Sequence, residues 1–260
     1  PMPDLSNAEI SIEGEYGFCI VCGESFHWEQ LTNTEAGSYC DNDAPGDWVT
    51  ETVLTVAVMG GEDWQMWIDA LDEAGVLADG AKTTAYTYIG KELTWPIYGH
   101  ATIGKAKEDL DRATVAIKES TSALNGEAYV SSLNAVVTQA SSAIPIMPLY
   151  ISALFKVMKA DGTYEGTIEQ IHALFTENLY GDSPRFDDGG HLFQNYKELE
   201  DDVQARIQTV WDSVTTATID ELTDYVGYHN EFLRLFGFGI DSVDYEQDVD
   251  AVAPIANMID

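Results

Sequence analysis

The stretch TAYTYIGKELTWPIYGHATIGKAK, residues 84–107, predicts a strand, a loop and the first turns of a helix. Tyr86 and Tyr88 lie in the predicted strand, and glycine and proline interrupt the loop that follows it. Tyr98 ends the loop, and eight residues separate it from Lys107 in the predicted helix. A phenol that donates a proton and an ammonium that stabilises it suit hydride transfer to a carbonyl compound. This spacing makes Tyr98 and Lys107 candidate catalytic residues.

Segments with strand and helix patterns alternate on both sides of this stretch. Strands are predicted at residues 53–59, where a continuous apolar run suits a buried strand, at residues 83–89 and at residues 133–137. For the first run, the last turn of a segment leading into Gly60 and Gly61 is the alternative. Helices are predicted at residues 62–74, at 103–120, and after the small polar run 138–142, near Pro145 and Pro148. This order predicts an α/β fold in which the ends of parallel strands contact a cofactor.

Apolar residues at helical spacing predict which helix faces enter the core. In the first helix these residues are Trp64, Trp67, Ile68 and Leu71, and in the second they are Ile103, Ala106, Leu110, Ala113 and Ile117. Three more helices are predicted, at residues 168–180, 199–214 and 219–236. The acidic segment after Gly239 is expected to lie on the surface.

The charge of the chain is strongly negative. Its 260 residues include 45 Asp and Glu against 12 Lys and Arg, a formal net charge of −33, and the acids are spread along the whole length. Such self-repulsion is screened at molar salt, which predicts a salt-adapted cytoplasm. Binding of cations or basic partners is the alternative. No basic stripe favours nucleic acid, and neither a membrane span nor a secretory signal is expected.

The three cysteines all lie in residues 1–49, which we interpret as a segment separate from residues 50–260. Cys19 and Cys22 form a CxxC pair, and Cys40 precedes Asp43 by three residues. Three thiolates with Asp43, or with His27, have the donor set of a tetrahedral zinc site. Free thiols packed in a small subdomain are the alternative. A redox role is disfavoured, because no helix pattern follows Cys19.

Four long strings resemble the trans-2-enoyl-CoA reductase family, also called the FabV type of enoyl-ACP reductase. They are VMGGEDWQMWIDALDEAGVLADGAKTTAYTYIG, TWPIYGHATIGKAKEDLDRA, VVTQASSAIPIMPLYISALFKVMKADGTYEGTIEQI and ELTDYVGYHNEFLRLFGFGIDSVDYEQDVD. The resemblance covers about residues 53–252. Tyr98 and Lys107 match the family's tyrosine and lysine separated by eight residues. Tyr88 matches its substrate-side tyrosine, and Thr138 matches its cofactor-side threonine.

The resemblance implies a Rossmann-like fold, similar to short-chain dehydrogenases, and reduction of the C2=C3 double bond of an enoyl-CoA or enoyl-ACP thioester. NADH is the implied cofactor, with NADPH as an alternative, and Lys107 and Thr138 are expected to bind it. The glycine-rich dinucleotide turn of the family's N-terminal half is not found before residue 53. A second chain that supplies this half, a non-catalytic scaffold, and replacement of the half by the cysteine segment are the three explanations.

Overall fold

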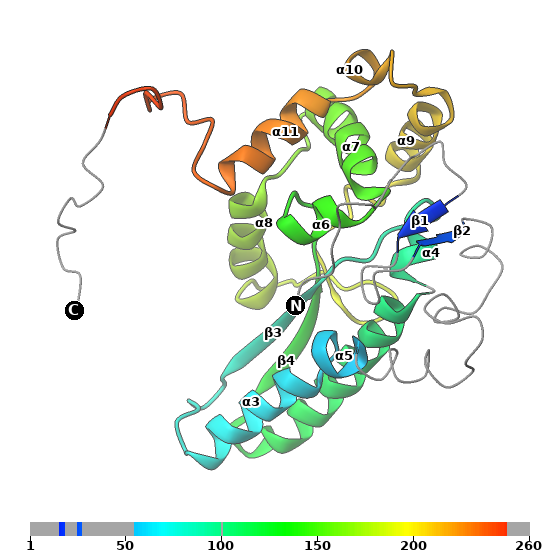
Figure 1. Ribbon diagram of the computed structural model, residues 1–260. Helices are drawn as coiled ribbons and strands as arrows, with labels where there is room; N and C mark the ends of the chain where they lie inside the picture. Colours follow the sequence, from blue (N-terminus) through cyan, green and yellow to red (C-terminus); the bar gives the residue numbers. More distant parts are fainter. Residues whose placement is uncertain (1–15, 19–24, 28–54, 100, 249–260) are drawn as a thin grey trace.

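A parallel sheet of three strands lies in the middle of the described part of the chain (Figure 1). The computed structural model describes residues 16–18, 25–27, 55–99 and 101–248. The strands lie in the order β3 (Lys82–Thr87), β4 (Glu127–Ser132) and β5 (Leu192–Phe193). Antiparallel strands β1 (Tyr16–Phe18) and β2 (Ser25–His27) form a separate pair. The predicted α/β class with a parallel sheet is confirmed.

Helices α3 (Glu62–Glu73) and α5 (Thr102–Ser120) cover one face of this sheet (Figure 1). Ile68 and Ile117 from the two helices pack together with Ala128 of β4. The predicted stripe of α5 is confirmed, because Ala106, Leu110, Ala113 and Ile117 are buried. The prediction for Trp67 is wrong: α3 turns Ile68 toward the core, and Trp67 remains 64% exposed.

The opposite face of the sheet is covered by a helix that changes along its length from an α-helix to the wider π-helix. α8 (Thr167–Ala173) continues as the π-helix η3 (Leu174–Leu179). Leu174, Leu179 and Leu192 form a small core there, and Tyr129 of β4 packs against it. Successive residues of a strand point to opposite faces, so Ala128 contacts the α5 side and Tyr129 the η3 side.

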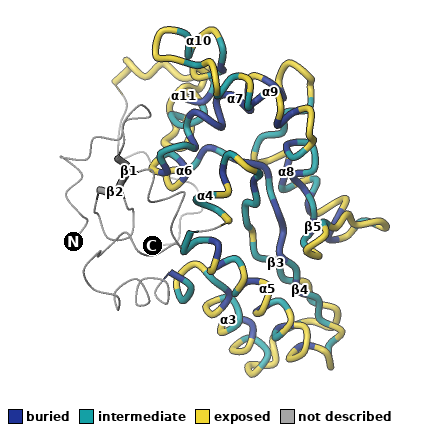
Figure 2. Tube along the Cα trace, turned by 90° about the vertical axis from the view of Figure 1, so that its right-hand side faces the viewer, coloured by how far each residue is buried: buried dark blue, intermediate teal, exposed yellow. Residues whose placement is uncertain are grey.

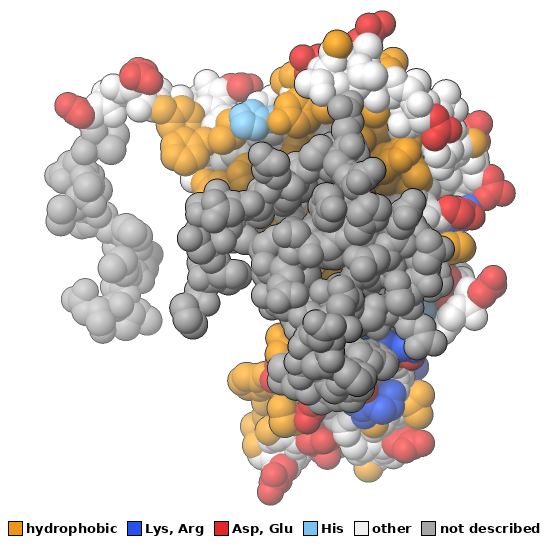
Figure 3. Space-filling view, turned by 45° about the vertical axis from the view of Figure 1, so that its right-hand side comes forward, with side chains coloured by type: hydrophobic (Ala, Val, Ile, Leu, Met, Phe, Trp, Pro, Cys, Tyr) orange, Lys and Arg blue, Asp and Glu red, His pale blue; other side chains and the backbone are white. Residues whose placement is uncertain are grey.

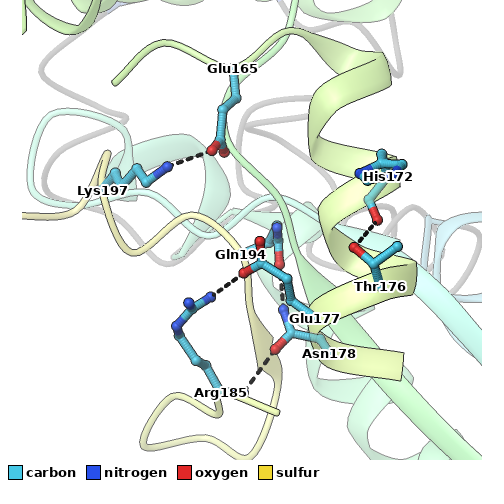
Figure 4. A network of polar contacts seen from close by, with 8 residues as sticks. All are labelled: Glu165, His172, Thr176, Glu177, Asn178, Arg185, Gln194 and Lys197. Atoms are coloured by element: carbon cyan, nitrogen blue, oxygen red, sulfur yellow. Dashed lines mark hydrogen bonds and ion pairs between the residues drawn. The ribbon is translucent and has the colours of Figure 1, made fainter. Parts of the chain in front are cut away.

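Polar contacts fix the widened helix to the strand beside it (Figure 4). Asn178 donates its side-chain amide to Gln194 and accepts a hydrogen bond of 2.8 Å from the Arg185 backbone N–H. Both amide side chains are buried. The segment that follows β5 is therefore held against the sheet, and it leads directly into Glu198.

A layer of helices packs around α7 (Met147–Asp161), beyond the ends of the strands (Figures 1 and 2). α9 (Asp201–Ser213) and α11 (Tyr225–Arg234) contact α7 and bury Val203, Ile207 and Tyr228 in the largest core. α7 begins with a proline in its first turn, as predicted, and ends at Gly162 in the left-handed conformation. Its residues are buried on nearly all sides, which Figure 2 shows as dark blue.

Short helices complete the framework around the strand ends. They are α4 (Trp95–Tyr98), α6 (Gln139–Ala143), α10 (Ile219–Leu222) and the 3-10 helix η2 (Ser122–Leu124). Thus the predicted loop before Lys107 contains a helical turn, and the polar run after Thr138 is helical.

Residues 55–59 are helical and lead into Gly60, which agrees with the alternative prediction for this segment and not with a strand. Two further predictions of secondary structure are wrong. Residues 133–137 form no strand, because the paired strand is the preceding segment, Glu127–Ser132. The helix predicted over residues 219–236 is divided at Thr223 and Asp224. There the Asp224 backbone N–H donates to the Ser152 carbonyl at 2.9 Å, and the Asp224 side chain accepts from Gly227 to cap α11.

Acidic side chains are scattered over the face drawn in Figure 3 rather than gathered in one patch. All Lys and Arg residues of the chain lie in its described part. Each of them forms an ion pair with a described carboxylate except Lys107, Lys118 and Lys156. Among the helices that the structure describes, none has the length and apolar character needed to span a bilayer.

Candidate active site

The candidate residues of the opening stretch meet at one cavity of about 530 Å³. Tyr88 directly follows β3, Tyr98 ends α4, and Lys107 lies in the second turn of α5. The cavity lies where β3 and β4 end, and its wall also includes the residues that follow β4. Its polar lining consists of Tyr86, Thr87, Tyr88, Tyr98, Lys107, Asn134, Thr138, Ser141 and Thr167. The site therefore lies at the carboxyl ends of the parallel strands, where α/β sheets bind ligands.

Lys107 is a half-buried cation that has no carboxylate partner within the described residues. Its Nζ donates a hydrogen bond of 2.6 Å to Thr87 Oγ1 and lies 5.5 Å from the centre of the Tyr98 ring. Burial lowers the pKa of Lys107 to about 8, against an opposing effect of the Asp111 charge. Such a cation is held ready for a ligand or a developing negative charge.

Tyr98 lies beside this cation with its phenol still protonated. Burial raises the pKa of Tyr98 to about 12. Among the described residues, none forms a hydrogen bond with the Tyr98 hydroxyl. Its proton is thus available to a bound ligand.

Tyr88 packs edge-on against Tyr98, with ring centres 4.9 Å apart. Its hydroxyl donates to Glu198 Oε1 at 3.0 Å. Burial, followed by the Glu198 charge, raises the pKa of Tyr88 well above its ordinary value. Tyr88 therefore lines the cavity, but its proton is directed away from it.

Thr138 caps the short helix α6. Its Oγ1 accepts a hydrogen bond of 2.9 Å from the Ser141 backbone N–H, and Ser141 Oγ accepts one of 2.9 Å from the Thr138 N–H. This reciprocal capping box fixes the turn after β4. The structure thus brings all four tyrosine, lysine and threonine candidates to one cavity.

Two residues of this region were not predicted from the sequence. Glu198 is completely buried, although it lies in an acidic run, ELEDD, that resembles a solvated surface. Asn134 lines the cavity and is 4% exposed, and no described residue forms a hydrogen bond with its side chain. The only sequence feature that pointed to Asn134 was its place as a single polar residue in an apolar run. No sequence feature indicated that Glu198 is buried.

The predicted metal ligands Cys19, Cys22, Cys40 and Asp43 lie outside the described residues, and the side chain of His27 is likewise not described. In residues 55–99 and 101–248, no group of three or more His, Cys, Asp or Glu side chains could hold a metal ion.

Two family models match the chain. The model of the trans-2-enoyl-CoA reductase catalytic region matches residues 29–180, and a model described as the enoyl reductase FAD binding domain matches residues 186–249. An enoyl-acyl-carrier-protein reductase (NADH) of Pseudoalteromonas translucida is 87% identical over 206 residues, which are 79% of this chain and 52% of that protein. One of Colwellia psychrerythraea is 72% identical over 204 residues, 78% of this chain and 52% of that protein. The chain thus spans about half the length of the curated relatives it matches.

Solved structures agree with these relatives. The trans-2-enoyl-CoA reductase of Clostridium acetobutulicum in complex with NADH has a TM-score of 0.75 and 43% identity, over 78% of this chain and 51% of that one. The trans-2-enoyl-CoA reductase of Treponema denticola in complex with NAD has a TM-score of 0.74 and 36% identity, over 93% of this chain and 58% of that one.

The residues of the second matched segment do not fit the pyrophosphate of FAD. Its described cations are Lys197, Arg206, Arg234 and His191, whose hydrogen bonds with Asp111 and Asp187 raise its pKa to about 9, and each is already paired with a carboxylate. Helices α9 and α10 each carry two acidic residues in their first turn, which disfavour a phosphate at a helix N-terminus. The matched catalytic region, the relatives and the solved structures together show that the chain belongs to the trans-2-enoyl-CoA reductase family.

Proposed function

We propose that the chain forms the catalytic region of an NADH-dependent enoyl-thioester reductase of fatty acid metabolism. The convergence of Tyr98, Lys107 and Tyr88 at one cavity, at the ends of parallel strands, is the observation that supports it. A phenol whose proton no described residue accepts, beside an ammonium without a described carboxylate partner, suits a reaction in which negative charge develops on a carbonyl oxygen.

Tyr98 is the proton donor in this proposal, and Lys107 stabilises it. When bound, NADH supplies the hydride that is added at C3 of the enoyl thioester. Negative charge would then develop on the thioester oxygen, where the Tyr98 hydroxyl donates a hydrogen bond, and uptake of a proton at C2 would complete the reduction. The Lys107 ammonium, 5.5 Å from the Tyr98 ring, stabilises the phenolate character that results. With a pKa of about 8, Lys107 is mostly cationic at neutral pH.

The cavity fits the reacting half of a dinucleotide. Lys107 offers an ammonium to ribose hydroxyls. Asn134 and Thr138, which follow β4, line another part of the cavity wall. Apolar side chains, among them Ile103, Leu110 and Met147, are suited to the acyl chain. We propose that the residues that hold the rest of the dinucleotide, and that choose NADH over NADPH, come from a second chain or from another stretch of the relatives' length. The glycine-rich turn would lie there.

The thioester carrier is either CoA or acyl carrier protein. The curated relatives are called acyl-carrier-protein reductases, and the solved structures are CoA reductases. We further propose a cytoplasmic protein adapted to high salt, on the basis of its dispersed negative charge.

The test is reduction of crotonyl-CoA, followed by NADH absorbance in molar salt, with NADH binding measured separately by fluorescence. Tyr98→Phe removes only the hydroxyl and should lower kcat by about 10²-fold or more, as loss of an oxyanion donor does. NADH affinity should remain unchanged in this variant. Undiminished turnover of Tyr98→Phe would refute the assignment, and NADH binding without any wild-type turnover would favour a non-catalytic scaffold.

We also propose a zinc ion bound by Cys19, Cys22, Cys40 and either Asp43 or His27. Elemental analysis of protein purified without added metal should find one zinc per chain, and Cys19→Ser should lose it. A metal-free wild-type protein with three titratable thiols would support free cysteines instead.

A further inference from the structure

Glu198 is a buried carboxylate directly behind the wall of the cavity. Its Oε1 accepts hydrogen bonds from the Tyr88 hydroxyl at 3.0 Å and the Tyr150 hydroxyl at 2.8 Å. Its Oε2 accepts one from the Ala135 backbone N–H at 2.7 Å. The side chain is 0% exposed. Three donors thus converge on one carboxylate, as expected for a buried acid that accepts hydrogen bonds.

The chain around Glu198 is fixed to the ends of both neighbouring strands. The backbone N–H groups of Gln194 and Asn195 donate to the Ser132 carbonyl at the end of β4. The Asn195 side chain donates to the Ile89 carbonyl after β3 at 2.9 Å. The carboxylate therefore cannot move independently of the strand ends that form the cavity.

Side-chain contacts hold the same segment from two other elements. Lys197 forms an ion pair with Glu165, which precedes α8 (Figure 4). Gln204 of α9 donates to the Glu198 backbone carbonyl at 2.8 Å and to the Tyr150 hydroxyl at 3.0 Å.

We propose, on the basis of the function proposed above, that Glu198 is a positioning residue for Tyr88 and, through it, for Tyr98. By accepting the hydrogen bond from the Tyr88 hydroxyl, it holds the Tyr88 ring edge-on against Tyr98 and leaves Tyr98 as the phenol that donates to the thioester oxygen. Tyr88 then supplies a wall and a lone pair, and Tyr98 keeps a proton that no described residue accepts.

The ionisation of Glu198 decides whether both of its oxygens can accept hydrogen bonds. Burial raises the pKa of Glu198 to about 7, although its three hydrogen bonds favour the ionised form. The titratable groups that face it are Tyr88 and Tyr150, and burial and the Glu198 charge raise the pKa of both well above ordinary values. Near neutral pH, Glu198 is thus the member of this cluster that changes its charge.

The first experiment observes the phenols in the ligand-free chain by ¹³Cζ NMR of labelled tyrosine in molar salt. In Glu198→Gln the side chain turns an amide N–H₂ toward the phenol oxygens, so the resonances of Tyr88 and Tyr150 should shift. The Tyr164 resonance, from a residue outside the cluster, serves as an internal control. Assignment comes from Tyr88→Phe and Tyr150→Phe. An unchanged Tyr88 resonance in a folded Glu198→Gln protein would overturn the proposal.

The second experiment is a double-mutant cycle on kcat. Glu198→Gln should lower kcat about tenfold, the size expected from loss of one hydrogen bond to a charged group, with NADH affinity unchanged. In a Tyr88→Phe background the same substitution should have no further effect, because Glu198 acts through the Tyr88 hydroxyl. An equal loss of kcat in both backgrounds would overturn the proposal.

Tyr150→Phe is the matched control, since it removes the other phenol of Glu198 and lines no part of the cavity. Tyr150→Phe should lower the free energy of unfolding, while the kcat of this variant remains well above that of Glu198→Gln. Absence of wild-type turnover would refute the proposed enzyme. The NMR shifts would still decide whether Glu198 orders Tyr88.

Discussion

Replacing Lys107 with Met should make the protein more stable while removing its activity. Lys107 is a half-buried cation without a carboxylate partner in the described chain, and burial lowers its pKa from 10.5 to about 8. Below pH 8 the folded state must hold a charge that water solvates better. A pKa shift of this size corresponds to about 3 kcal/mol of folding free energy.

The net gain should be smaller than this value. Met fills nearly the same volume as the lysine stem, but Thr87 Oγ1 loses the hydrogen bond donated by Lys107, which is worth about 1 kcal/mol. We therefore expect Lys107→Met to raise the free energy of unfolding at pH 7 by about 2 kcal/mol.

The pH dependence gives the sharper test. In the unfolded chain Lys107 keeps its proton up to its ordinary pKa, whereas in the folded protein it loses the proton near pH 8. The unfolded state thus binds more protons between these values, so the wild type gains stability as pH rises. Relative to Lys107→Met, the wild type should gain about 2 kcal/mol between pH 7 and pH 9.5.

The assay is urea unfolding in molar salt at both pH values, with Lys105→Met as the control. Lys105 is exposed on the same helix and pairs with Glu108, so its loss should change stability by less than about 0.5 kcal/mol. The reasoning fails if Lys107→Met is no more stable than Lys105→Met at pH 7. It fails equally if the difference from wild type is independent of pH.

Two further predictions concern activity and binding. Because the Lys107 ammonium is lost above a pKa of about 8, kcat for enoyl reduction should fall above that pH, and Lys107→Arg should move any remaining activity to higher pH; a flat profile to pH 10 would contradict the role of this cation. Thr138→Val removes the oxygen that caps α6 and should lower the free energy of unfolding by about 1 kcal/mol and weaken NADH binding. Thermal unfolding and fluorescence titration measure the two effects, and Ser142→Ala, a neighbouring change in the same helix that spares the cap, is the control.

Local periodicity predicted the helices of this fold well and its strands less well. The stripe from Ala106 to Ile117 needed only helical spacing, because α5 faces one core. β4 was missed because its sequence, EAYVSS, mixes small and polar residues, and Ser131 and Ser132 are buried by their neighbours rather than by their own hydrophobicity. Residues 55–59 include the β-branched Thr55, Val56 and Val58, yet they are helical, so tertiary context overrides propensity there.

The candidate site was predictable where its residues are close in sequence. Tyr88, Tyr98 and Lys107 lie within one strand, turn and helix, so their convergence follows from local structure. Glu198 meets Tyr88 only after the chain has passed through β4, α7 and β5. No pattern in the sequence around Glu198 distinguishes it from the exposed acids Glu200 and Asp201 beside it.

The parallel pairing of the strands also has a consequence for the order in which the protein assembles. β3 can pair with β4 only after the α5 segment has been synthesised, and β5 only after the α7 and α8 segments. Glu198 follows β5, so on the ribosome its carboxylate reaches the Tyr88 hydroxyl only after every residue that lines the cavity has been synthesised. A chain arrested before Glu198 would therefore contain the complete cavity lining but lack the acceptor that fixes the Tyr88 hydroxyl.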